Sequence, residues 1–170
     1  MVPGDVTRPV PDRVKQALFN IIGSDIQNAH FLDIFAGTGG VGIEALSRGA
    51  ARTTFFEKDR RALKTLRANL DHTRLSEAAE VIPGDAFKLL RDHASGGFDY
   101  LYIAPPQYKE MWKKTLQTLD SHLPWMNPDA WVIVQMHPRE YEDLELDHLV
   151  EFDQRKYGST LLVFYEYESE

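Results

Sequence analysis

The sequence of 170 residues has no cysteine. It therefore forms no disulfide bond, and it has no thiolate nucleophile and no cysteine ligand for zinc or an iron–sulfur cluster. It also lacks an apolar run near the roughly 20 residues that a membrane-spanning helix needs. Its first residues, MVPGD, have neither the charged nor the apolar region of a secretory signal. We therefore expect no membrane segment, no secretory leader and a cytoplasmic location.

Potential metal ligands are scarce and scattered. The histidines form no i, i+4 pair and have no cluster of acidic residues beside them; they are His30, His72, His93, His122, His137 and His148. Such spacing does not supply the converging ligands of a metal centre. We therefore expect no metal site.

Basic residues are outnumbered, with 19 lysines and arginines against 26 aspartates and glutamates and a net charge of −7. This balance argues against an anionic partner such as nucleic acid. From Arg139 onward, however, the chain has ten acidic residues and three basic ones, which account for the whole −7. The preceding residues are neutral in sum, so the larger part of the chain is compatible with a basic face.

Helical and strand-like segments alternate along the chain. After Pro11, apolar residues at helical spacing predict an amphipathic helix that stops at Gly23. Expected strands then cover residues 30–35, 52–56, 79–82, 98–103 and 130–136, and expected helices cover residues 40–49, 59–70, 85–93 and 111–119. Two further β-rich runs, 149–156 and 160–167, meet at a Tyr-Gly-Ser turn. This order predicts one α/β domain with a doubly wound, mostly parallel seven-stranded sheet that ends in an antiparallel hairpin.

A glycine-rich turn is the first candidate for a binding site. The run Gly37-Thr38-Gly39-Gly40-Val41-Gly42 matches G-x-G-x-x-G, follows an expected strand and opens an expected helix. Glycines let the backbone approach a ligand without an intervening Cβ, and a helix N-terminus offers N–H groups. Glu57 stands at the end of the next strand, where a carboxylate can accept hydrogen bonds from both hydroxyls of a ribose. The segment therefore predicts that an adenosine-containing ligand binds at the carboxyl ends of the strands.

NAD, FAD and S-adenosylmethionine are all held by this geometry, and Asp33 helps to distinguish them. Asp33 lies four positions before Gly37, in an arrangement similar to the first motif of class I methyltransferases. A carboxylate there suits the ammonium group of a methionine and repels a pyrophosphate, although it can also serve only as a cap. Asp85-Ala86 follows the next strand, where such folds contact the adenine, and Asp85 is equally suited to cap a helix. S-adenosylmethionine is favoured over a nicotinamide, because no Tyr-x-x-x-Lys pair for hydride transfer is found.

The segment Ala104-Pro105-Pro106-Gln107-Tyr108 follows the fourth expected strand, at the edge where open α/β sheets bind ligands. It resembles the fourth motif of amino-methyltransferases, which is usually Asp or Asn, then two prolines, then Tyr or Phe. The resemblance implies that a side-chain oxygen and a backbone carbonyl accept the two hydrogens of an exocyclic amine while the aromatic ring stacks on the base.

The chain as a whole resembles the RsmD-type 16S ribosomal RNA guanine-N2 methyltransferases of bacteria. Matching blocks recur in order: Thr7-Arg8-Pro9, residues 33–49, Phe56-Glu57-Lys58-Asp59, Gly84-Asp85-Ala86, His137-Pro138 and Tyr157-Gly158. The resemblance implies a class I methyltransferase that transfers a methyl group from S-adenosylmethionine, leaving S-adenosylhomocysteine, to the N2 amine of a guanine. It also implies 16S ribosomal RNA or a small-subunit particle as the partner of a monomeric enzyme.

The resemblance further implies the parts of the site. Residues 1–170 form a single methyltransferase domain, in which residues 1–24 cover the site and residues 30–170 form the Rossmann-like core. The implied cofactor-binding residues are Asp33, Phe35, Ala36, Gly37, Thr38, Gly39, Glu57, Lys58, Asp85 and Ala86. The implied catalytic residues are Ala104, Pro105, Pro106 and Tyr108, and the implied RNA-binding residues are Arg8, Arg13, Gln107, Lys109 and Lys113.

Two residues depart from the family pattern. Ala104 replaces the acidic or amide residue, and Gln107 separates the prolines from Tyr108. A hydrogen bond to a charged acceptor is worth about 1.5–3 kcal/mol, so its loss is expected to slow transfer by roughly 10- to 150-fold unless another group replaces it. The alternative hypothesis is therefore a module that binds S-adenosylmethionine, has weakened or lost catalysis, and acts in RNA or protein binding.

Overall fold

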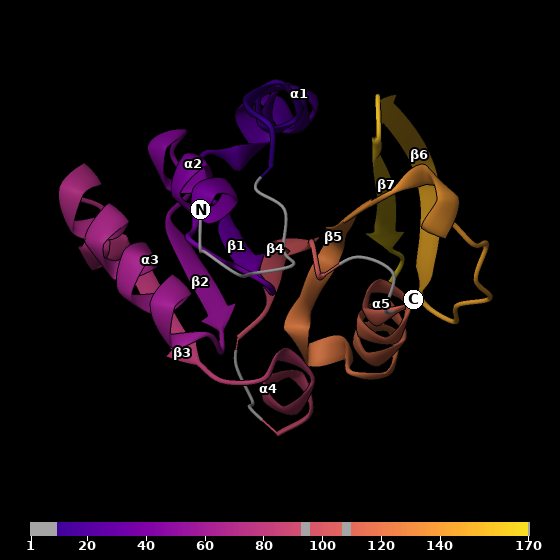
Figure 1. Ribbon diagram of the computed structural model, residues 1–170. Helices are drawn as coiled ribbons and strands as arrows, with labels where there is room; N and C mark the ends of the chain where they lie inside the picture. The colour runs from indigo at the N-terminus through magenta and orange to yellow at the C-terminus, as the bar shows by residue number, and fades with distance from the viewer. Residues whose placement is uncertain (1–9, 93–95, 107–109, 170) are drawn as a thin grey trace.

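A computed structural model describes residues 10–92, 96–106 and 110–169 of the chain. Its seven-stranded sheet has the order β3-β2-β1-β4-β5-β7-β6 (Figure 1). The strands are β1 (His30–Asp33), β2 (Arg52–Glu57), β3 (Ala79–Pro83), β4 (Phe98–Ile103), β5 (Met126–Met136), β6 (Leu149–Tyr157) and β7 (Thr160–Tyr167). The first five strands are parallel, and β7 pairs antiparallel with both β5 and β6. The predicted sheet and its closing hairpin are confirmed.

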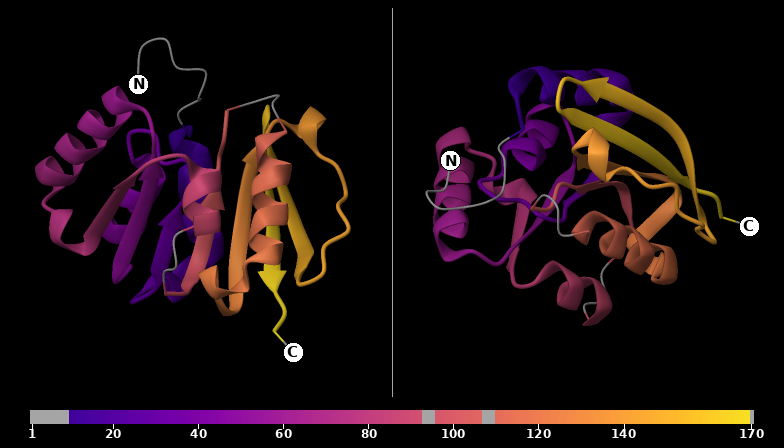
Figure 2. Two further views of the ribbon diagram at one scale, coloured as in Figure 1. Left: turned by 90° about the horizontal axis from the view of Figure 1, so that it is seen from below. Right: turned by 45° about the vertical axis from the view of Figure 1, so that its right-hand side comes forward.

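Helices cover both faces of this sheet. They are α1 (Asp12–Ile22), α2 (Gly40–Ser47), α3 (Arg60–Thr73), α4 (Ala86–Asp92) and α5 (Met111–Ser121), with short 3₁₀ turns at Gly23–Ile26, Ser76–Ala78, Leu123–Trp125 and Pro138–Glu140. The first three helices pack on one face and α4 and α5 on the other (Figure 1). Figure 2 shows β3 and β6 at opposite edges of the sheet. Within the described ranges, no helix is long and apolar enough to span a bilayer.

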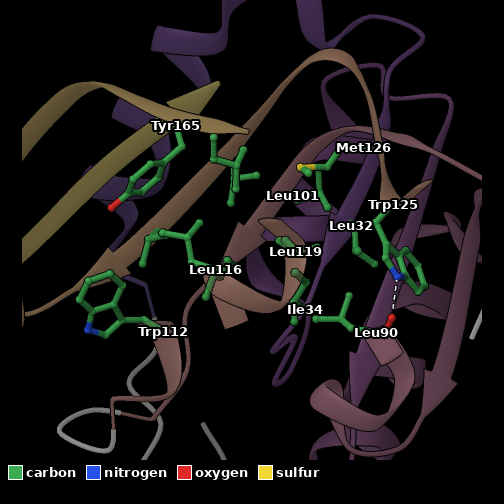
Figure 3. Close-up of a cluster of buried hydrophobic side chains, with 14 of the residues drawn as sticks. Leu32, Ile34, Leu90, Leu101, Trp112, Leu116, Leu119, Trp125, Met126 and Tyr165 are labelled. Carbon is green, nitrogen blue, oxygen red and sulfur yellow. Dashed lines mark hydrogen bonds between the residues drawn. The ribbon is translucent and has the colours of Figure 1, made fainter. Parts of the chain in front are cut away.

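The strands feed two separate cores because their side chains alternate between the faces. Leu101 and Ile103 point toward α4 and α5, whereas Tyr100 and Tyr102 point toward α1 and α2. Figure 3 shows the first of these cores, where the indole Nε1 of Trp125 donates to the Leu90 carbonyl at 2.8 Å. Period-two alternation within buried strands therefore determines which residues face each helical layer.

Several element boundaries differ from those expected. The first strand ends at Asp33 rather than at residue 35, because the chain turns there into the glycine loop. β5 begins at Met126 rather than at residue 130, since Met126 pairs with Phe98 before a register shift at Tyr100. Asp129, with φ of 65°, lies within this irregular stretch. The helix expected to end at residue 70 continues to Thr73.

Candidate cofactor and substrate site

The glycine loop leaves its backbone open on one side and closed on the other. Gly39 has φ of 90°, and an added Cβ there would lie 2.2 Å from Cδ1 of Leu66. Gly37 has φ of 59°, yet no atom of the described residues lies within 4 Å of the position that its Cβ would take. Both φ values favour glycine. The loop is therefore tightly packed against α3 at Gly39 and borders open space at Gly37, which fits a ligand that approaches the backbone closely.

Glu57 is fixed at the end of β2 by backbone donors. Its Oε1 accepts from the N–H of Gly37 at 2.8 Å, and its Oε2 accepts from the N–H groups of Lys58 at 3.0 Å and Asp59 at 2.8 Å. Each carboxylate oxygen offers more than one lone pair, so Oε1 can still accept from a further hydroxyl. These contacts hold the Glu57 carboxylate, which is predicted to bind a ribose, against the glycine loop. Lys58 is exposed beside it.

Asp33 is almost fully buried, with 2% of its surface exposed. Its Oδ2 accepts from the N–H of Gly42 at 3.1 Å, in the first turn of α2. Burial raises the pKa of this carboxyl from 3.8 to about 7, the Gly42 hydrogen bond lowers it, and the charge of Glu57 raises it further. The carboxyl thus caps α2, and an ammonium group beside it would favour its charged form.

The residues expected around the adenine follow β3. The Oδ1 of Asp85 accepts from the N–H of Lys88 at 3.1 Å, so Asp85 caps α4, while Ala86 is buried. The N–H of Gly84 donates to the Glu57 carbonyl at 3.0 Å, which brings the ends of β3 and β2 together. Phe35 lies in an edge-on contact with Phe87, with ring centroids 6.2 Å apart.

Two residues of this region were not predicted from the sequence. The first is Phe87, whose ring contacts Phe35. The second is Asn69 of α3, whose side-chain amide donates to the Thr38 carbonyl at 3.0 Å and so holds the glycine loop. Helical periodicity marks Asn69 as lying near the buried side of α3, but it does not identify a partner 31 residues away.

The proline segment leaves the sheet at the end of β4, next to the glycine loop. β1 lies between β2 and β4, and the N–H of Ile34 donates to the carbonyl of Tyr102 at 3.0 Å. Ala104, Pro105 and Pro106 are half-buried, and Ala104 packs on the α1 and α2 side. The predicted residues Gln107, Tyr108, Lys109 and Arg8 lie outside the described residues. The described parts of the three motifs therefore meet at neighbouring strand ends.

A polar pair on β4 and β5, consisting of a buried tyrosine and a half-buried glutamine, lies beside this segment. The hydroxyl of Tyr102 donates to Oε1 of Gln135. Burial raises the pKa of Tyr102 well above its usual value, and the charge of Asp33 raises it further. The tyrosine therefore remains protonated, and it is a donor that the sequence patterns did not identify.

The predicted RNA-binding cations occupy different environments. Lys113 on α5 forms ion pairs with Glu142 and, at 3.4 Å, with Glu110. The guanidinium of Arg13 on α1 lies 5.9 Å from the ring centroid of Tyr157. These two residues project from helices on opposite faces of the sheet, so the structure does not bring them together.

A separate group of cations lies on and beside α3. Its members are exposed and, within the described chain, form no ion pair; they are Lys58, Arg60, Arg61, Lys64, Arg67 and Arg74, which we call the α3 basic surface. Residues three and four apart share a helix face, so Arg60, Lys64 and Arg67 point in one direction. The described residues contain no group of three His, Asp or Glu side chains suited to a metal ion.

Comparisons with known proteins give consistent results. YlbH of Bacillus subtilis (strain 168), provisionally named an rRNA methyltransferase, is 38% identical over 168 residues, which cover 97% of this chain and 90% of that protein. Ribosomal RNA small subunit methyltransferase D of Haemophilus influenzae is 35% identical over 130 residues, which cover 75% of this chain and 67% of that protein.

Solved structures share the same fold. The structure of yhhF from Escherichia coli, provisionally described as a methyltransferase, aligns with a TM-score of 0.86 at 27% identity and covers 100% of this chain and 92% of that one. An RNA methyltransferase from Salinibacter ruber in complex with S-adenosyl-L-homocysteine aligns with a TM-score of 0.71 at 17% identity over 96% of this chain and 95% of that one. The second likeness supports the class I fold.

The sequence pattern of a family described as conserved hypothetical protein 95 matches residues 1–166. The match extends from the N-terminal segment through the glycine loop and the proline segment to the closing hairpin. The resemblance predicted from separate motifs is thus confirmed over nearly the whole chain: this protein belongs to the conserved hypothetical protein 95 family, the family of the RsmD-type methyltransferases.

Proposed function

We propose that this protein transfers the methyl group of S-adenosylmethionine to the exocyclic N2 amine of a guanine in 16S ribosomal RNA. The observation that carries the proposal is the meeting of three motifs at the ends of β2, β1 and β4: Glu57, the glycine loop and the Ala104–Pro106 segment. Family relatives named as small-subunit rRNA methyltransferases support the reaction and an RNA substrate.

The cofactor half of the site is assigned from the contacts of its residues. S-adenosylmethionine is the methyl donor, and it supplies an electrophilic methyl group on a sulfonium sulfur. Gly37 and Gly39 would hold its methionine end with backbone groups, and Asp33 would face the ammonium. Glu57, already held by three backbone donors, would accept from the ribose hydroxyls. Asp85 and Ala86 would border the adenine, with Phe35, Thr38 and Lys58 completing the rim.

The substrate half orients the amine. An unpaired or flipped guanine would enter beside Ala104 and stack on Tyr108. The backbone carbonyls of Ala104 and Pro105 would accept the two hydrogens of its N2 amine, which directs the nitrogen lone pair toward the methyl carbon. The nitrogen would then form a bond to that carbon as the carbon–sulfur bond breaks, and the amine would release one proton to water. Positioning of this kind supplies much of the acceleration in a single displacement.

The alternative of a non-catalytic module is not favoured. Its support was the absence of a side-chain acceptor at Ala104. The relatives that cover most of this chain bear methyltransferase names, and substitution at one acceptor leaves the two backbone carbonyls in place.

The α3 basic surface supports an RNA partner despite the acidic net charge. Residues 58–74 hold six of the 19 lysines and arginines of the chain and only two acidic residues. Exposed, unpaired cations attract phosphates because binding releases counterions. The proposal includes 16S RNA or a small-subunit particle as the substrate, a monomeric and cytoplasmic enzyme, and residues 1–170 acting as one domain in which residues 1–24 cover the site. Arg8, Arg13, Gln107, Lys109 and Lys113 are the proposed contacts near the reacting base.

Transfer of labelled methyl groups tests the proposal. S-adenosylmethionine with a labelled methyl group is offered with small-subunit RNA, and separately with particles that lack this methylation. We expect N2-methylguanosine with the wild-type chain and none with Glu57→Ala, while Glu77→Ala, an exposed carboxylate, serves as the matched control. Binding of S-adenosylhomocysteine without transfer to either substrate, together with activity restored by Ala104→Asp, would instead establish the binding module.

A further inference from the structure

The pair formed by Tyr102 and Gln135 lies at the point where the substrate base is expected. Ile103, the last residue of β4, pairs with Val134 of β5. The residues that follow these two, Ala104 and Gln135, therefore lie side by side. Tyr102 and Ala104 both pack on the α1 and α2 side of the sheet. Gln135 lies two residues beyond Ile133, which faces the same core, and strand alternation therefore places its side chain on that side too.

Only one of the two polar atoms of the Gln135 carboxamide forms a hydrogen bond with a described residue. Its Oε1 accepts from the Tyr102 hydroxyl and has a second lone pair, whereas its Nε2 has no hydrogen-bond partner among the residues that the structure describes. The residue is half-buried, and its Nε2 is not among the fully buried unpaired atoms of the described residues, so this donor is accessible to a group that enters from solvent.

The orientation of this amide is set by its partner. Tyr102 is 1% exposed, and its O–H has no other acceptor among the described residues. Rotation of the amide by 180° would turn Nε2 toward the hydroxyl and leave the buried tyrosine proton without an acceptor. Gln135 consequently presents a fixed donor–acceptor pair instead of one that adapts to either purine.

We propose that Gln135, held by Tyr102, reads the Watson–Crick edge of the target guanine: Oε1 accepts from N1–H and Nε2 donates to O6. This assignment rests on the proposed function, and it deepens it by naming a specificity residue for the base. Guanine presents a donor and an acceptor at N1 and O6, whereas adenine presents the opposite pair. The N2 amine remains for the carbonyls of Ala104 and Pro105. Tyr102 does not touch the base and is a positioning residue.

A base analogue separates recognition from chemistry. 2-Aminopurine keeps the 2-amine but lacks O6 and the N1 proton. Small-subunit RNA is assembled by ligation with either guanine or 2-aminopurine at the methylated position and offered as the same RNA or particle. With the wild-type chain, we expect kcat/KM to be about 5- to 150-fold lower for 2-aminopurine, which is the discrimination of one bidentate side chain–base pair. Part of this ratio reflects the different reactivity of the two amines, so variants are compared with the wild-type ratio.

The decisive variant is the double substitution Tyr102→Phe/Gln135→Met. Removing both partners leaves no buried hydroxyl or amide unpaired, so the fold is preserved better than in Gln135→Met alone. We expect its activity on guanine to fall by about 5- to 150-fold while most of the preference over 2-aminopurine disappears. Tyr102→Phe alone frees the amide to rotate and should reduce the preference to an intermediate value. Gln117→Met, on the exposed side of α5, should keep the wild-type ratio.

Binding of S-adenosylhomocysteine and the melting temperature are measured for every variant. A purely structural role of the pair would lower both properties without changing the ratio between the two bases. Wild-type transfer to guanine combined with an unchanged ratio in the double variant would overturn the role of Gln135 and leave the proposed function intact. Absence of wild-type transfer to any small-subunit RNA or particle would overturn the proposed function itself and the base-reading role with it.

Discussion

The proposed cofactor half of the site, at the ends of β1 and β2, and the proposed substrate half, at the end of β4, position their polar groups by different means. At the ends of β1 and β2, Glu57 is held by three backbone N–H groups and Asp33 by one. At the end of β4, Ala104 has no polar side-chain group, and the next strand contributes one at Gln135. The first arrangement depends on backbone donors close to each carboxylate in the chain or on the adjoining strand end. The second depends on the register between two strands.

The largest effect on ligand affinity should follow from substitution of Glu57 in the proposed cofactor half of the site. Its replacement by alanine removes an acceptor for a ribose hydroxyl together with the three backbone hydrogen bonds that fix the end of β2 against the glycine loop, and each hydrogen bond to a charged group is worth about 1.5–3 kcal/mol. We expect affinity for S-adenosylhomocysteine to fall by more than about 100-fold, as measured by calorimetry. Glu77→Ala should bind as the wild type does. A loss below about threefold in Glu57→Ala would show that the ribose does not bind there.

A second test of the cofactor side uses the pH dependence of Asp33. Its pKa is raised from 3.8 to about 7 in the folded protein. The folded state therefore holds more protons than the unfolded state between these values, and stability falls as pH rises from about 4 to 7. Relative to Asp33→Asn, the wild type should lose on the order of 4 kcal/mol above pH 7, and the gap should close toward pH 4.

Denaturant unfolding at several pH values measures this gap, with Asp25→Asn, an exposed carboxylate, as the control. Asp33→Asn should also weaken S-adenosylhomocysteine binding above pH 7, where the wild-type Asp33 carboxylate is charged and suited to an ammonium group. Parallel stability curves for the wild type and Asp33→Asn would contradict the burial argument. Equal cofactor affinities would contradict the ammonium contact.

On the substrate side, Ala104→Asp sharpens the comparison. If Gln135 already contributes to holding the base, a new carboxylate should raise kcat by less than about tenfold in the wild-type background. In the Tyr102→Phe/Gln135→Met background the same change should give a larger gain, up to the roughly 150-fold expected for one charged acceptor. Steady-state kinetics on small-subunit RNA compares the four chains. Equal gains in both backgrounds would show that the two positions act independently.

The smallest effect per residue is expected on the α3 basic surface. Each single-strand phosphate contact contributes about 0.7 to the slope of log affinity against log salt. The triple variant Arg60→Gln/Lys64→Gln/Arg67→Gln should therefore lower that slope by roughly 2 and leave S-adenosylhomocysteine binding unchanged. Arg91→Gln and Arg155→Gln, whose side chains pair with neighbouring carboxylates, are the matched controls. An unaltered slope would show that RNA binds elsewhere.

Contiguous motifs explain which parts of the site the sequence could predict. The glycine loop and Glu57 were found because turn, helix start and strand end follow one another in a fixed order. The pairing of Tyr102 with Gln135 was not found, because it depends on the register of two parallel strands whose residues are 33 positions apart. The ion pair between Lys113 and Glu142 escaped prediction for the same reason, since it joins α5 to a segment beyond β5.

The fold was predicted from the alternation of helical and strand-like segments along the sequence. The element boundaries that were predicted wrongly have local causes. The early start of β5 could not be predicted because the segment Met126-Asn127-Pro128-Asp129 has the composition of a turn. Pairing of Met126 with Phe98 overrides that preference. Tertiary pairing of this kind outweighs local propensity at sheet ends.

The hydrogen bond from Asn69 to the Thr38 carbonyl links the helix that carries the proposed RNA-binding surface to the glycine loop. The outward side of α3 carries the α3 basic surface, and its inward side contacts the glycine loop. If RNA binding moves α3, this hydrogen bond moves the glycine loop with it, and any resulting coupling between the two binding affinities is reciprocal. RNA engaged on α3 would thus alter cofactor affinity by the same factor by which the cofactor alters RNA affinity.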